Sequence, residues 1–233
     1  MARLIAALIR HADYQQWADV PSAHQPWPLN SQGESQAQEC VQIMFDMIMQ
    51  NGWSLVPSVD SSRLLRAWQT ATILAGGLAR LFNISLPVES HDALAERCVG
   101  SLANLTTVQI EAILRDDPRV SDPPVDWKAD SHYCLPLQGA ESLMQAGERV
   151  AAHVSQAMSV LPADERDRVK VFVGHGAAFR HAAFHLGVLE LEQLRQLSMF
   201  HCRPVLIECL GDGQWQHVGG DWKVRPMSGR FGD

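Results

Sequence analysis

LIAALIRH, residues 4–11, is a short apolar run that ends abruptly in an arginine and a histidine. A second run of this kind, VKVFVGHG at residues 169–176, ends in a histidine between two glycines. Apolar runs of this length are typical of strands that are buried inside a sheet covered on both faces. The two segments therefore predict two core strands.

The rest of the chain alternates between helix and strand patterns. Ser31 followed by Glu34 fits a capping box with Ser31 as the N-cap of a helix, and Gly52 ends that helix. Alternating elements are typical of an α/β fold, and we expect a three-layer sandwich with a mostly parallel central sheet flanked by helices. Further helices are predicted at 64–82, 107–115, 140–160, 177–186 and 190–197, and further strands at 55–59, 84–88, 204–210 and 214–218.

The composition is that of an ordinary globular protein. Of the 233 residues, 46% are hydrophobic and 19% are charged, and we expect one domain over residues 1–233 with an inserted, cap-like segment at about 97–139. The formal net charge of −7 leaves no global basic surface for nucleic acid or anionic lipid.

Two further features bear on the compartment. The five cysteines are odd in number and show no C-x-x-C spacing, which indicates free thiols rather than a disulfide framework or a thiolate zinc site. The apolar run at 4–9 is too short for a signal peptide, and no stretch approaches the roughly 20 apolar residues that span a bilayer. We therefore expect a cytoplasmic protein.

Charged and histidine side chains follow the ends of four predicted strands. Arg10 and His11 follow the first strand, Arg63 follows the second, Glu96 comes after the third, and His175 follows the fourth. Functional groups gather at the carboxyl ends of the strands in α/β folds, so we expect these side chains to converge.

Such a set of side chains predicts phosphoryl transfer. Guanidinium groups match phosphate oxygens in a bidentate fork. An imidazole nitrogen can attack phosphorus, and a carboxylic acid can protonate the departing oxygen. This chemistry needs no metal ion, and we expect neither a metal nor another cofactor.

The chain resembles the histidine phosphatase superfamily, which includes the cofactor-dependent phosphoglycerate mutases and many phosphomonoesterases. The resemblance runs in order from residue 4 to about 187. Its segments are LIRHAD at 8–13, PLNSQG at 28–33, SRLLRAWQTA at 62–71, LAER at 94–97 with Gly100, GAES at 139–142 with Arg149, and GHG at 174–176.

The resemblance implies a phosphoglycerate mutase-like fold and a role for each candidate residue. His11 would be the nucleophile that becomes a phosphohistidine. Arg10, Arg63 and His175 would hold the transferred phosphoryl group, with His175 also in the catalytic set. Glu96 would be the general acid and then the base for the attacking water.

Three functions remain open on this evidence. Mutases of this family resemble one another in carrying a basic insert with adjacent arginines. Residues 97–140 instead scatter four basic residues among six acidic ones and hold no adjacent arginine pair. A phosphatase acting on a small or medium phosphomonoester is therefore favoured over a mutase. A binding or scaffold protein that has lost turnover is the third alternative, and a homo-oligomer is left open.

The surplus histidines raise a metal-dependent alternative. His181 and His185 lie four residues apart on a predicted helix, a spacing that zinc can use, but no third ligand accompanies them in sequence. Helix packing is the favoured interpretation of this pair. The loop at 127–133 is our candidate for substrate selection. Arg180 is left open between phosphate binding and exposure to solvent.

Overall fold

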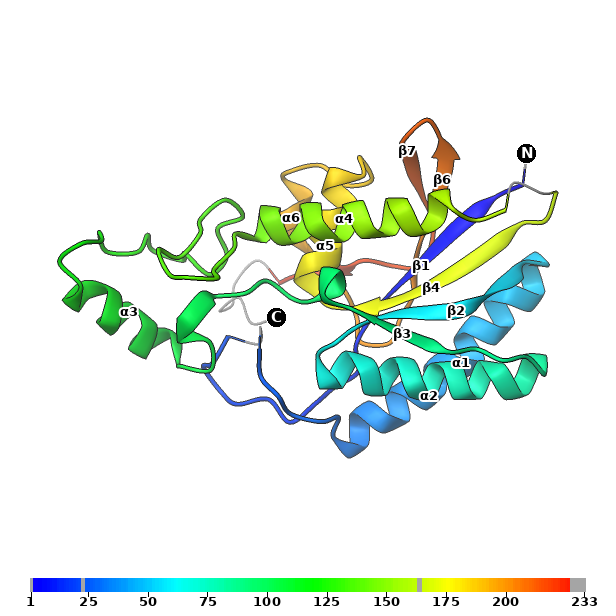
Figure 1. Ribbon diagram of the computed structural model, residues 1–233, viewed down its shortest axis with the longest axis horizontal. Helices are drawn as coiled ribbons and strands as arrows, with labels where there is room; N and C mark the ends of the chain where they lie inside the picture. Colours follow the sequence, from blue (N-terminus) through cyan, green and yellow to red (C-terminus); the bar gives the residue numbers. More distant parts are fainter. Residues whose placement is uncertain (1, 22–23, 163–164, 227–233) are drawn as a thin grey trace.

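The computed structural model describes residues 2–21, 24–162 and 165–226 of the chain. Six strands form the central sheet in the order β3-β2-β4-β1-β6-β7 (Figure 1). The first four of these run parallel to one another, and β6 runs antiparallel to β1 and β7. The strands are β1 (Leu4–Arg10), β2 (Ser54–Ser62), β3 (Val88–His91), β4 (Arg168–Gly174), β6 (Val205–Gly211) and β7 (Gln214–Gly219).

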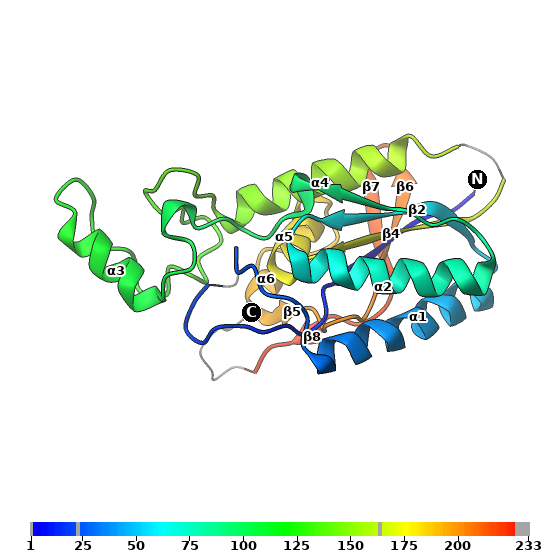
Figure 2. The same ribbon diagram turned by 60° about the horizontal axis from the view of Figure 1, so that its bottom comes forward.

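Helices cover both faces of this sheet (Figures 1 and 2). Helices α1 (Ser31–Asn51) and α2 (Leu65–Phe82) lie on one face, and α4 (Leu143–Ser159) and α5 (Gly176–His185) lie on the other. Because alternate residues of a strand point to opposite faces, Ile5 packs with the first pair of helices and Leu8 with the second. The predicted three-layer α/β sandwich is confirmed.

Two details of the α1–α2 layer explain its packing. Asn30 caps α1, because its side chain accepts a hydrogen bond from the N–H of Gly33. The cap therefore lies one residue before the predicted Ser31. Helix α2 continues through Gly76 and Gly77, and a Cβ on Gly77 would come within 2.5 Å of the Val41 side chain on α1. That glycine lets the two helices approach closely.

A separate small cluster forms in the insertion. Its ends are joined by an isolated bridge between Val99 and Ala140. Between them lie the 3₁₀ helix η2 (Gly100–Leu102) and helix α3 (Thr107–Asp116), and this segment projects from one end of the sheet (Figure 1). The cluster consists of Val99, Ile110, Leu114, Trp127 and Leu135, all buried among themselves.

The observed elements differ most from the predicted ones in short segments and at the edge of the sheet. Strand β3 begins at Val88, where the predicted strand ends, and it continues into the 3₁₀ helix η1 (Asp92–Leu94). A two-stranded sheet of β5 (Leu197–Ser198) and β8 (Lys223–Val224) was not predicted, and helix α6 covers only Gln193–Gln196. No helix in the described part of the chain is long and apolar enough to cross a membrane.

Candidate active site

The register of the sheet brings two histidines together. Arg10 at the end of β1 pairs with Gly174 at the end of β4, and the N–H of His11 donates to the Gly174 carbonyl at 2.9 Å. The next residue of each strand is a histidine, and the His11 and His175 rings lie 5.1 Å apart between centroids. Their relative exposures are only 3% and 0%. The two histidines thus form the buried centre of the site.

The hydrogen bonds of His11 determine which of its nitrogens is nucleophilic. Nδ1 lies 2.7 Å from the carbonyl oxygen of Ala12, to which it donates its proton. Nε2 therefore carries the lone pair, and it accepts a hydrogen bond from Nε of Arg66 at 3.1 Å. An imidazole in this tautomer presents Nε2 for attack on an electrophile.

Arg66 is the guanidinium at the centre of the site. It is fully buried in the first turn of α2, and a second nitrogen lies 3.2 Å from Nδ1 of His175. Another guanidinium nitrogen donates to the carbonyl of Gln25, in the loop that covers the histidine pair. One side chain thus contacts both histidines, a position suited to the oxygens of a phosphoryl group between them.

Arg63 does not lie in this group. Its side chain is 64% exposed and pairs with Asp92 at 3.1 Å. The expectation that Arg63 lies beside the two histidines is therefore wrong. Arg66, three residues further along, lies there instead. The signal that could have identified Arg66 was available, because it shares a helix face with Thr70 and Leu74, which are both buried.

Arg10 keeps one donor available at the site. Its terminal nitrogen donates to the carbonyl of Met199 at 2.9 Å, while its buried Nε has no hydrogen-bond partner in the described part of the chain. A Cβ on Gly176 would lie 3.1 Å from the Arg10 Cδ. The glycine after His175 therefore leaves room for this guanidinium beside the two histidines.

His175 is oriented by contacts on both ring nitrogens. Nδ1 faces Arg66, and Nε2 lies 2.8 Å from the Oγ of Ser62 at the end of β2. His175 also precedes the first turn of α5, where the helix dipole favours a bound anion. These features suit a residue that binds a phosphoryl group.

Glu96 lies beside the start of α5. Its carboxylate is buried, with 7% residue exposure, and accepts hydrogen bonds from the backbone N–H groups of Arg97 and Ala178 at 3.0 and 3.1 Å. Ala178 lies in the first turn of α5, so the carboxylate is held beside the same helix start as His175. The structure thus brings Glu96 to the histidine pair.

A second ion pair fixes the segment that carries Glu96. Arg149 on α4 binds Glu141 at 2.6 Å and also donates to the carbonyls of Asp92, Ala93 and Ala95. These two charged residues belong to the GAES segment and its following arginine. We assign them to positioning, since they hold the backbone that leads into Glu96.

Sequence reasoning missed His201. It follows β5, forms an isolated bridge to Arg10 and places its Nδ1 2.5 Å from the carbonyl oxygen of His11. Its ring lies 5.4 Å from that of His11. No motif or strand-end position marked this residue, because it reaches the site only through the long-range pairing of its loop with β1.

The imidazoles of the site are held neutral. Burial, and then the positive charge of Arg66, lower the pKa of His11 and of His175 well below the ordinary value of 6.5. Burial, and then the charge of Arg10, lower the pKa of His201 to about 4. His11 thus remains unprotonated, and nucleophilic, on the acid side of neutrality.

This arrangement makes the fold sensitive to acid. Between pH 6.5 and the lowered values, the unfolded chain binds protons that the folded chain does not, so stability falls as the pH falls. We expect the free energy of unfolding to drop by about 1–2 kcal/mol per histidine between pH 7 and 5 in urea titrations. The His201→Gln variant should lose about a third of that dependence. A stability that does not change over this range would contradict neutral, buried imidazoles.

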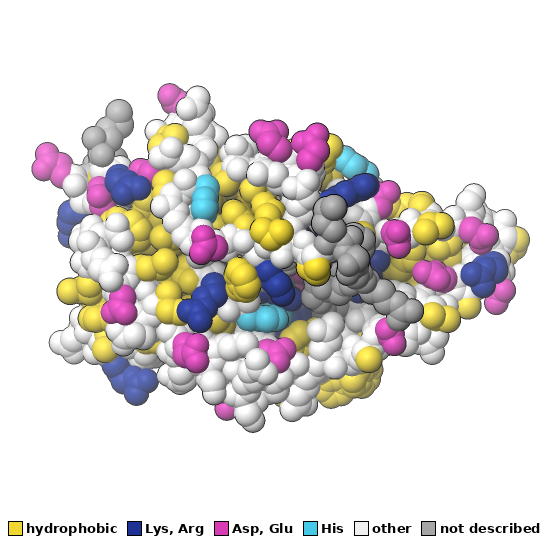
Figure 3. Space-filling view, turned by 180° about the vertical axis from the view of Figure 1, so that it is seen from behind, with side chains coloured by type: hydrophobic (Ala, Val, Ile, Leu, Met, Phe, Trp, Pro, Cys, Tyr) yellow, Lys and Arg dark blue, Asp and Glu magenta, His cyan; other side chains and the backbone are white. Residues whose placement is uncertain are grey.

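Two hollows adjoin the site. A cavity of about 250 Å³ is bordered by Glu96 and Ala177, and a wider groove of about 1200 Å³ includes Arg10 and His201 in its wall. Figure 3 shows lysine, arginine and histidine side chains near the middle of one face. The basic side chains that line the smaller cavity come from distant parts of the chain: Arg97, Lys128, Arg180, Arg195 and Arg225.

The histidine pair considered for zinc in the sequence does not converge. His181 Nδ1 lies 2.8 Å from the Ala177 carbonyl, and its Nε2 lies 3.0 Å from Ser131 Oγ. His185 Nε2 instead faces the Met144 carbonyl at 2.9 Å. These hydrogen bonds support the packing interpretation.

Comparison with known proteins agrees with this geometry. The family model of the histidine phosphatase superfamily (branch 1) matches residues 6–220, and the chain belongs to this superfamily. A search of curated protein sequences gave no match.

Solved structures show the same fold at low sequence identity. The native mycobacterial glucosyl-3-phosphoglycerate phosphatase is 21% identical with a TM-score of 0.68, over 93% of this chain and 96% of that one. The alpha-ribazole phosphatase from Shigella flexneri is 18% identical with a TM-score of 0.67, over 92% and 94%. A putative alpha-ribazole-5'-P phosphatase from Escherichia coli is 19% identical with a TM-score of 0.60, over 96% of each chain.

Proposed function

We propose that this protein is a metal-independent phosphomonoester hydrolase that works through a phosphohistidine on His11. The observation that carries the proposal is the tautomer of His11, whose Nε2 lone pair faces Arg66 beside His175. Membership of a phosphatase superfamily and the phosphatases among the structural neighbours support the same activity.

The first chemical step transfers the phosphoryl group to the enzyme. Arg10, Arg66 and His175 bind its non-bridging oxygens, and Arg66 takes the role expected of Arg63. Nε2 of His11 attacks phosphorus in line with the ester bond. The bond to the leaving oxygen breaks, and that oxygen takes a proton from Glu96 in its acid form.

The second step regenerates the enzyme. Glu96, now a carboxylate, takes a proton from a water molecule as the water oxygen attacks phosphorus. The bond between phosphorus and Nε2 breaks, and its electron pair returns to the imidazole. Inorganic phosphate then leaves, and Glu96 again carries the proton needed for the next turnover.

Substitution of Glu96 should affect substrates unequally. The Glu96→Gln variant keeps a side-chain oxygen that accepts the two backbone N–H groups but cannot transfer a proton. We expect kcat for ethyl phosphate to fall by about 10²–10⁴-fold, and the first step with nitrophenyl phosphate to slow much less, because nitrophenolate leaves without protonation. Burst kinetics measure the two steps separately. An equal loss in the first step for both esters would show that Glu96 is not the acid.

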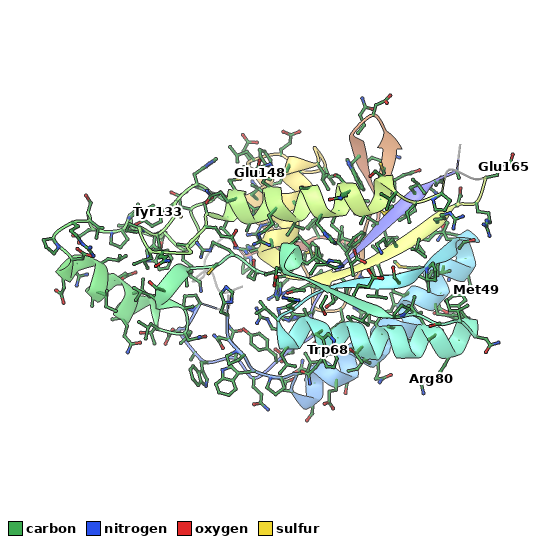
Figure 4. The ribbon with its side chains drawn as sticks, viewed as in Figure 1. Met49, Trp68, Arg80, Tyr133, Glu148 and Glu165 are labelled. Atoms are coloured by element: carbon green, nitrogen blue, oxygen red, sulfur yellow. The ribbon has the colours of Figure 1, made fainter. Side chains whose placement is uncertain are left out.

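The cavity beside Glu96 is where the leaving group would lie. Its size, about 250 Å³, is slightly below the usual range for ligand sites and suits a small leaving group. Five basic side chains and three acidic ones, Glu96, Asp126 and Asp130, line this cavity. The excess of positive charge supports a substrate whose leaving group carries a second negative charge. Residues of the insertion border this cavity, so the 97–139 segment fits the role of a cap on a single domain. Figure 4 places Tyr133 of this segment beyond the start of α4.

The charge preference can be tested with two esters of equal carbon number. Phosphoglycolate carries a carboxylate that ethyl phosphate lacks, and we expect its kcat/KM to be about tenfold higher or more. Arg195→Gln should lower the ratio of the two values by about threefold or more. Arg119→Gln removes an arginine that pairs with Asp117 outside the cavity, and it should leave the ratio unchanged. A ratio near one in the wild type would contradict the anionic preference.

The same basic cavity keeps mutase activity as a second candidate. A mutase returns the phosphoryl group to the organic product, whereas a hydrolase releases one inorganic phosphate for each ester consumed. Measurement of both products with a phosphorylated hydroxy acid separates the two activities, and we expect stoichiometric release of phosphate.

The five cysteines are free thiols in the structure, which fits the proposed cytoplasmic location.

A further inference from the structure

Three potential metal ligands, Asp60, His91 and His153, converge between the sheet and α4. Asp60 on β2 pairs in register with Glu89 on β3, and His91 lies two residues further along β3. Residues two apart on a strand face the same side, so these three side chains share the face that α4 covers. His153 of α4 meets them there, with its ring 4.4 Å from that of His91.

The distances between the donor atoms suit a single ion. Asp60 Oδ2 lies 2.9 Å from His153 Nε2 and 3.8 Å from His91 Nε2, and His91 Nε2 lies 3.9 Å from Glu89 Oε2. A tetrahedral zinc ion with bonds of about 2.0–2.1 Å separates its ligand atoms by about 3.3 Å. The observed distances lie on both sides of that value.

His91 and Asp60 each direct a potential ligand atom into this cluster. The Nε2 of His91 is buried and has no hydrogen-bond partner within the described residues, and its two carboxylate neighbours are too distant to bond it directly. Asp60 is only 3% exposed, and Lys170 contacts its other oxygen, Oδ1, at 2.7 Å. The ammonium group therefore leaves Oδ2 to face the imidazoles.

The chemical types of the side chains in this cluster also suit zinc. Imidazole and carboxylate are both common ligands of zinc.

We propose that Asp60, His91 and His153 form a zinc site in which a water molecule takes the fourth position. Bound zinc would tie α4 to β2 and β3 immediately behind the catalytic histidines, since Ser62, which contacts His175, lies two residues beyond Asp60. It would also brace Glu96, because His91 leads directly into η1 and the Glu96 segment. The site takes no part in the bond-breaking steps, and this proposal does not depend on the proposed activity.

Calorimetry on the chelator-treated full chain tests the site with ZnCl₂ as the only ligand, in a buffer free of phosphate. We expect one equivalent to bind with a Kd of about 1 µM or tighter and to raise the Tm. His91→Gln and His153→Gln should each weaken binding by at least about 100-fold. His132→Gln, an exposed histidine of the insertion, is the matched control and should bind zinc as the wild type does.

Two further measurements keep the result unambiguous. Co²⁺ in place of zinc should give the intense visible absorption of a tetrahedral ion, and this band should disappear in His91→Gln. Circular dichroism of each variant without metal establishes that it is folded. Absence of saturable zinc binding by the wild type, or equal binding by a folded His91→Gln, would overturn the site. Hydrolysis in EDTA should continue in either case, which separates this test from that of the activity.

Discussion

Replacement of His11 by alanine should remove phosphatase activity, with a fall in kcat of about 10⁴-fold or more on nitrophenyl phosphate in excess EDTA. The reason is chemical, because the variant lacks the unprotonated Nε2 that faces Arg66 beside His175. Steady-state kinetics on the purified variant measure the loss. Imidazole removal also leaves a cavity at the end of β1, so circular dichroism and urea unfolding should accompany the assay.

Two controls make that result specific. His217→Gln changes an exposed histidine on β7, whose Nε2 faces the Gly220 carbonyl, and it should retain most of the activity. A folded His11→Ala protein should still bind inorganic phosphate through the remaining groups. If His11→Ala retained substantial activity in EDTA, another residue would have to be the nucleophile.

Arg66 should be the second most damaging position, and Arg63 should be almost neutral. Arg66→Gln removes the guanidinium that contacts both histidines, and we expect kcat/KM to fall by about 10²–10³-fold. Arg63→Gln removes only an exposed ion pair with Asp92, which contributes little. Its kcat/KM should stay within about twofold of the wild type.

The two arginine variants form a matched pair, since the same substitution is made three residues apart. Phosphate binding measured by calorimetry gives a readout independent of turnover, and it should weaken in Arg66→Gln alone. A large loss in Arg63→Gln with little change in Arg66→Gln would reverse the assignment and restore the expectation drawn from the sequence.

This difference shows what the sequence could predict about the site. The apolar runs that end at His11 and His175 identify two core strands, and the carboxyl ends of parallel strands meet by geometry. The position of Arg63 directly after a strand suggested the same for its side chain. A residue just before a helix can point either way, however, and only the buried face of α2 selects Arg66.

Other parts of the site depend on contacts that no local pattern records. His201 reaches the backbone of His11 from a loop 190 residues later in the chain. The five basic residues that line the cavity beside Glu96 are likewise scattered over the sequence. In the fold, β3 was misplaced because the edge of a sheet carries a weaker apolar pattern than its centre, and only two of its four residues are even partly buried.

The most direct test of the central claim is detection of the covalent intermediate. Wild-type protein is mixed with ³²P-labelled nitrophenyl phosphate, quenched with alkali within milliseconds, and digested with trypsin. The account predicts an alkali-stable, acid-labile label in the peptide at 11–63, with fragmentation placing the phosphoryl group on His11 rather than His24. Label on another residue, or turnover in which no label accumulates even when Glu96→Gln slows the second step, would contradict it.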